Sequence, residues 1–146
     1  MAIGRIVLGY AAAAIVGVAL ASAFHTQMVI QALGEAGAVI SLDRRLSMTL
    51  DDLVGLIPQF GAVIAIALAI GFLVAAGLKR VLTPLAPIAY PLAGAAAIGV
   101  ALTAMAMAFD GISPLAGART TAGFGLQCLA GAISGLVFSA LAVRRK

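Results

Sequence analysis

The chain has 146 residues, of which 64% are hydrophobic and only 10% are charged. A soluble domain of this length has too little interior to cover so much apolar surface, which excludes an ordinary globular protein. The net charge is +4, but the basic residues flank apolar runs instead of forming a stripe or a face, so we expect no nucleic-acid partner.

Four apolar runs alternate with charged segments. They cover residues 6–24, 58–78, 84–109 and 121–143. Each run is long enough to cross a bilayer core of about 30 Å at the helical rise of about 1.5 Å per residue. We therefore predict one all-α domain over residues 1–146, an integral membrane four-helix bundle with four transmembrane helices and a short amphipathic helix in the first outer loop.

The first run, 6–24, has no helix breaker after it before Gly34, so the helix can extend to residue 33. This run also resembles a signal peptide, because Met1–Arg5 suits a charged n-region and Ala21-Ser22-Ala23 suits a small-residue cleavage site. The apolar run is longer than the typical signal-peptide core of about 7–15 residues. We therefore expect an uncleaved anchor; cleavage would leave three helices in the same orientation.

The segment 49–57 is the best-specified local element of the sequence. Thr49 is a good N-cap and Asp52 follows three residues later, as in a capping box. One apolar stripe at helical spacing comprises Leu50, Leu53, Val54 and Ile57. These features predict a short amphipathic helix over 49–57, lying on the outer membrane surface or over the bundle, with Pro58 in the first turn of the next helix.

The link between the second and third runs, Lys79–Thr83, is very short, which predicts an antiparallel helical hairpin. In the third run, Pro84 fits the first turn of a helix, whereas Pro91 removes a backbone hydrogen bond and predicts a kink. The fourth helix is expected to start at Thr120 or Thr121.

Charge predicts the orientation in the membrane. If the chain crosses four times, one side holds six basic residues, Arg5, Lys79, Arg80, Arg144, Arg145 and Lys146. The other side holds Arg44, Arg45 and Arg119 with all five acids, Glu35, Asp43, Asp51, Asp52 and Asp110. The positive-inside rule therefore predicts both termini in the cytoplasm, in a bacterial inner (plasma) membrane.

Small residues repeat at four-residue spacing on two of the helices. The residues concerned are Gly9, Ala13, Gly17 and Ala21 in the first helix, and Gly131, Gly135 and Ser139 in the fourth. Such stripes let backbones approach closely, which is a main source of helix association in lipid. They favour either packing within the bundle or a face that docks a second copy or another membrane subunit.

Four polar residues are candidates for a pore or a ligand site. Gln127 lies deepest and needs a hydrogen-bond partner, for which Thr103 or a carbonyl near Pro91 is available; the alternative is a role in a pore. Arg119 adjoins a glycine-containing polar stretch that suits a small anion or a lipid headgroup. His25 is either an interfacial anchor or a proton or metal group. Cys128, the single cysteine, is expected to be a packing residue.

No charged residue falls well inside an apolar run, which argues against a proton-coupled carrier. We therefore expect a non-catalytic structural or accessory subunit, or a homo-oligomer, that acts through helix–helix and lipid packing. Its partners are membrane lipids and other membrane subunits, and it needs no cofactor or metal. The alternative is a small channel or passive transporter with a path lined by Gln127 and Thr103. A third hypothesis, a membrane enzyme, would use the outer residues His25, Glu35, Asp43 and Asp110.

Overall fold

The computed structural model describes residues 2–81 and 88–142, and all regular elements within these ranges are helices. They are α1 (Ala2–Glu35), α2 (Leu42–Leu56), the π-helical turn η1 (Ile57–Gly61), α3 (Ala62–Val81), α4 (Ala89–Ala108), the 3-10 turn η3 (Ala116–Ala118) and α5 (Thr121–Ala142). Four segments are long and apolar enough to cross a membrane. The predicted all-α, four-helix integral membrane fold is thus confirmed.

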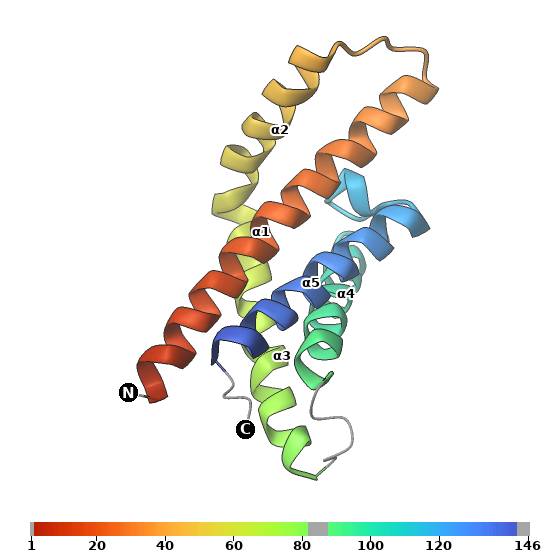
Figure 1. Cartoon of the computed structure of the whole chain (residues 1–146). Coiled ribbons are helices and arrows are strands. Elements are labelled where there is room, and N and C mark those ends of the chain that lie inside the picture. The colour runs from red at the N-terminus through yellow and green to blue at the C-terminus, as the bar shows by residue number, and fades with distance from the viewer. Residues whose placement is uncertain (1, 82–87, 143–146) are drawn as a thin grey trace.

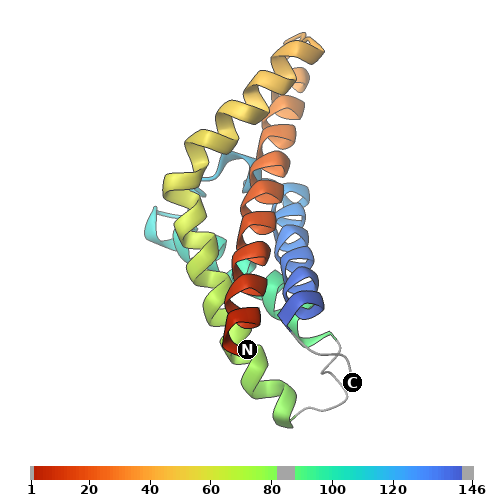
Figure 2. The same cartoon turned by 60° about the vertical axis from the view of Figure 1, so that its left-hand side comes forward.

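The four long helices alternate in direction, and α5 packs antiparallel to both α1 and α4 (Figures 1 and 2). On its other side, α4 packs against α3, whereas α3 touches α1 much less extensively. Arg5, Lys79 and Arg80 lie at one end of the bundle, here called the basic end. The α1–α2 connection and the α4–α5 loop lie at the other end, here called the acidic end, which carries all the acidic side chains.

The interior is packed by aliphatic side chains near the middle and by aromatic rings towards the basic end. Leu68 of α3 and Ile98 of α4 are completely covered or nearly so. The rings of Phe72 and Phe138 stack with their centroids 4.6 Å apart, and Tyr90 meets Phe138 edge-on at 4.9 Å. Aromatic pairs of this geometry contribute favourable free energy beyond that of burying their apolar area. The cluster therefore stabilises the packing of α3, α4 and α5 against one another.

The helix α2 begins earlier than the sequence predicts. Its N-cap is Ser41, whose hydroxyl accepts a hydrogen bond from the Arg44 N–H at 3.4 Å. The predicted start at Thr49, for a helix over 49–57, is wrong: Thr49 lies inside the helix and donates to the Arg45 carbonyl at 2.8 Å. Residues 42–48 contain no helix breaker, and Asp43 in the first turn interacts favourably with the helix dipole. The helix therefore begins after Ser41 and not after Thr49.

The sequence left two placements open for this helix, the outer membrane surface or over the bundle, and the structure packs it against α1. α2 runs alongside the second half of α1, and together they project beyond the ends of α4 and α5 as an arm (Figure 1). α1 has 34 residues and is therefore about 51 Å long, well beyond a bilayer core of about 30 Å. α2 continues into α3 through η1, which contains Pro58, and the helix bends there (Figure 1).

The kink predicted at Pro91 is wrong as well. Pro91 lies in the first turn of α4, where the first helical hydrogen bond runs from the Leu92 N–H to the Ile88 carbonyl at 3.0 Å. The N–H that proline lacks has no helical partner at this position, so no bond is lost. Pro84 and the basic residues 144–146 lie outside the described residues.

Candidate functional site

The small-residue stripe of α1 lies inside the bundle, against α5. A Cβ added at Gly9 would lie 2.9 Å from the Cβ of Ala142, and one at Gly17 would lie 2.5 Å from the Ser134 hydroxyl. Ala13 and Ala21 of the same stripe are buried. These residues therefore serve packing within the protein and leave no free strip on that face of α1.

The small-residue stripe of α5 lies on the face of α5 that packs against α4. A Cβ at Gly131 would collide with the carbonyl of Gly94, and a Cβ at Gly135 would collide with the carbonyl of Tyr90. Ser139 lies outside this tight contact, is only half-buried and donates to the Leu136 carbonyl of its own helix. α5 is thus the central helix, and small residues let α1 pack closely on one of its faces and α4 on another.

Gln127 and Thr103 do not lie on a common path. Gln127 is 1% exposed and its amide donates to the Ala21 carbonyl of α1 at 3.0 Å. The partners predicted for it, Thr103 or a carbonyl near Pro91, are wrong. Thr103 is exposed, and its hydroxyl donates to the Gly99 carbonyl of its own helix at 2.8 Å. Gln127 therefore links α5 to α1 through an interhelical hydrogen bond.

The polar residues of the acidic end form separate local contacts. His25 Nδ1 accepts a hydrogen bond from the Gly117 N–H at 3.1 Å, which anchors the α4–α5 loop on α1. Arg119 is exposed and donates to the Ser113 carbonyl at 3.1 Å, within that loop. Among the described residues, no group of three His, Cys, Asp or Glu side chains is arranged to hold a metal ion.

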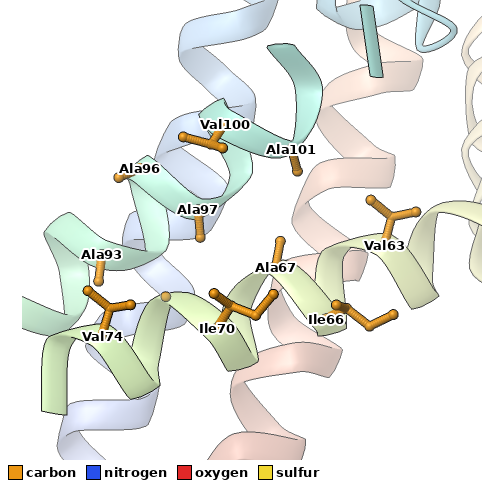
Figure 3. A pocket seen from close by; sticks show the side chains of 11 residues that line it. Val63, Ile66, Ala67, Ile70, Val74, Ala93, Ala96, Ala97, Val100 and Ala101 are labelled. Carbon is orange, nitrogen blue, oxygen red and sulfur yellow. The ribbon is translucent and has the colours of Figure 1, made fainter. Parts of the chain in front are cut away.

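A groove of about 480 Å³ lies between α3 and α4 in the middle of the bundle and is here called the α3–α4 groove (Figure 3). Its half-buried floor consists of small residues, Ala67, Gly71, Ala93, Ala97 and Ala101. Its rims carry Val63, Ile66, Ile70, Val74, Ala96 and Val100. The surface is almost entirely apolar, as a face turned towards lipid or another transmembrane helix must be.

The floor of the groove shows how close α3 and α4 approach one another. A Cβ at Gly71 would lie 2.8 Å from the Cβ of Ala97 and 3.0 Å from the carbonyl oxygen of Ala93. In Figure 3, Ala97 points towards α3, and Ala67 points towards α4. The side chains between the two helices are so short that they leave a trough above the contact.

Reasoning from the sequence missed this groove, although the signal that finds it is present. Ala67 and Gly71 in α3, and Ala93, Ala97 and Ala101 in α4, repeat at the same four-residue spacing as the stripes of α1 and α5. In an alanine-rich chain the spacing alone does not separate stripes that the protein covers itself from those that it leaves open. Comparison of the chain with protein-family models, with curated proteins and with solved structures gave no match.

Proposed function

We propose that this chain is a non-catalytic structural or accessory subunit of a membrane assembly, which acts through helix–helix and lipid packing. The observation that carries the proposal is the α3–α4 groove. Two parallel rows of small residues lie open there, and small residues at a helix surface are what lets a further transmembrane helix pack closely in lipid.

The occupant that suits the groove is a transmembrane helix with larger apolar side chains. From Val63 to Val74 the groove follows α3 for about 17 Å, roughly half the thickness of the bilayer core. Rim residues such as Ile66 and Ile70 are 61% and 59% exposed, so they are free to interdigitate with a neighbouring helix. Dispersion attraction between the two packed surfaces is the main favourable term available within lipid.

The same proposal includes the location and orientation of the chain. Arg5, Lys79 and Arg80 lie at the basic end, and the acidic side chains lie at the opposite end. Under the positive-inside rule this charge bias favours a bacterial inner membrane with the basic end, and both termini, in the cytoplasm.

Cysteine cross-linking in the source membrane tests whether the groove is an interface. In a Cys128→Ser background, Ile70→Cys places a thiol on the groove rim. Ile15→Cys places one on the free face of α1, where the Ile15 side chain is 70% exposed. We expect a reagent with one thiol-reactive end and one photoreactive end to link the first variant, and not the second, to one partner of defined mass. Equal linking of both variants would overturn the proposal.

A second measurement asks whether filling the groove releases the partner. Ala67→Phe fills the floor, and Ala19→Phe adds the same ring to the exposed surface of α1. Native mass spectrometry after extraction into lipid nanodiscs should show a complex of fixed stoichiometry for the unaltered chain and for Ala19→Phe, and a lone chain for Ala67→Phe. The mass of the partner separates a second copy from a different subunit. A chain that is monomeric without any substitution would also overturn the proposal.

A further inference from the structure

α1 and α3 diverge towards the basic end (Figure 1). A second hollow lies between the long helices there. It has a volume of about 550 Å³ and is here called the Lys79 crevice. Residues of all four long helices line it, among them Ile6 and Tyr10 of α1, Ala76 and Lys79 of α3, Tyr90 of α4 and Phe138 of α5. A hollow of this size lies within the range that holds a small ligand or part of a lipid.

The inner part of the crevice is apolar. Its base is the aromatic cluster, in which Phe72 stacks on Phe138 at 4.6 Å and meets Tyr90 edge-on at 5.9 Å. Towards the middle of the bundle, the Tyr10 hydroxyl reaches across from α1 and donates to the Ala65 carbonyl of α3 at 2.6 Å. This hydrogen bond bridges α1 and α3 at that end of the crevice, and the apolar walls suit a hydrocarbon chain.

At the basic end of the crevice lies a cation that meets no carboxylate among residues 2–81 and 88–142, which the structure describes. The Lys79 ammonium donates to the Tyr90 hydroxyl at 2.9 Å and lies 4.9 Å from the centroid of that ring. An ammonium has three donors, and Tyr90 accepts only one of them. Every side-chain carboxylate of the chain lies at the acidic end, so none of them neutralises Lys79.

The two other basic residues that the structure describes at this end, Arg5 and Arg80, do not share this arrangement. Arg5 donates twice to the Leu141 carbonyl, at 3.1 and 3.3 Å, and thereby caps the end of α5. Arg80 is exposed and does not line the crevice. Among the described basic residues, Lys79 is therefore the cation that lies at the edge of an apolar hollow, at the end of the bundle where lipid headgroups would lie.

We infer that the Lys79 crevice binds an anionic phospholipid, with one acyl chain against the aromatic cluster and the phosphate on the Lys79 ammonium. In a bilayer an apolar hollow fills with an acyl chain, and the uncompensated charge at its mouth selects among headgroups. The inference goes beyond the proposed function and is independent of it, because it concerns a different hollow and stands even if no helix docks in the α3–α4 groove.

The experiment compares lipid retention by the full-length chain in nanodiscs made from equal parts of phosphatidylglycerol and phosphatidylcholine. Native mass spectrometry, with the bilayer removed stepwise by collisional activation, counts the last lipid that remains bound. We expect the unaltered chain to retain phosphatidylglycerol about fivefold over phosphatidylcholine, since one basic residue at a lipid surface contributes about this factor. Inorganic phosphate added in excess should not displace the lipid, because it lacks the acyl chain.

Two pairs of variants separate the charge from the hollow. Lys79→Gln should abolish the preference, Lys79→Arg should restore it, and Arg80→Gln, which removes an equal charge from the next residue, should leave it intact. Ala76→Phe fills the crevice and should remove the retained lipid altogether, whereas Ala19→Phe on the exposed face of α1 should not. Equal preferences in Lys79→Gln and Arg80→Gln, a lipid retained unchanged in Ala76→Phe, or displacement by phosphate alone would each overturn the inference.

Discussion

Gly94 of α4 and Gly131 of α5 face each other so closely that a Cβ added to either one would collide with the carbonyl oxygen of the other. This reciprocal contact brings the two helix backbones together near the middle of the bundle. Backbone carbonyls cannot move aside as a flexible side chain can. The separation between α4 and α5 is thus set by the absence of both side chains.

Replacing either glycine by alanine should therefore destabilise the bundle. We expect Gly131→Ala to lower the free energy of unfolding by about 1–3 kcal/mol, as overpacking of a close contact does. Gly125→Ala is the matched control, since a Cβ there meets nothing within 4 Å and alanine favours the helix by up to about 1 kcal/mol. Unfolding in mixed micelles with increasing SDS measures both, and equal stability of the two variants would contradict this account of the contact.

The buried amide of Gln127 gives a second prediction. Gln127→Leu removes the hydrogen bond to the Ala21 carbonyl, and interhelical bonds of this kind within membranes contribute about 0.6–2 kcal/mol. Thr103→Val should change stability much less, because Thr103 is exposed and bonds only within its own helix. The same SDS titration compares them. A larger loss for Thr103→Val would show that Thr103 has a role which the described contacts do not contain.

The base of the arm depends on one charged hydrogen bond. The Thr26 hydroxyl, which is fully buried on α1, lies 2.7 Å from a carboxylate oxygen of Asp52 on α2. Asp52→Asn should weaken this contact by about 1–2 kcal/mol and speed amide hydrogen exchange throughout α2. Asp51→Asn removes an equal charge from the exposed neighbour and should leave the exchange unchanged. Identical exchange in the two variants would mean that other contacts hold the arm.

The contact between the α4–α5 loop and α1 gives a fourth prediction. A Cβ at Gly117 would lie 2.7 Å from the Cα of His25 and 2.8 Å from its Nδ1 atom. Gly117→Ala should push the loop off α1, lengthen the Gly117–His25 hydrogen bond and cost about 1–3 kcal/mol. The amide exchange of residues 115–120 should rise, whereas Ala116→Ser, at the exposed neighbour, should not change it. A protected amide at residue 117 in the alanine variant would contradict the predicted displacement.

The spanning helices could be predicted because lipid demands long apolar helical segments and the sequence supplies them. The start of α2 could not, because Ser41 and Thr49 both make acceptable caps and the choice depended on the helix formers between them. The outcome for Pro91 depended on where α4 begins, which apolar composition leaves undefined. Which side chain meets Gln127 is a matter of helix rotation, and neither hydropathy nor charge encodes rotation in a chain whose helices are apolar all round.

The candidate surfaces were harder to predict for a related reason. Four-residue repeats of small side chains also lie in helix contacts that the protein makes within itself, such as that of Gly17 with Ser134. Only the positions of α1, α4 and α5 reveal that the repeat in α3 is partly open. Likewise, the sequence shows Lys79 only as one of several basic residues that flank apolar runs. Its position over the Tyr90 ring depends on how α3 packs against α4.

Because α2 passes into α3 through η1 without a loop, the two helices form one continuous helical segment that bends near Pro58. α3 forms one wall of the α3–α4 groove and one wall of the Lys79 crevice. The continuous helical segment Leu42–Val81 therefore packs against α1 with its first half and lines both hollows with its second half.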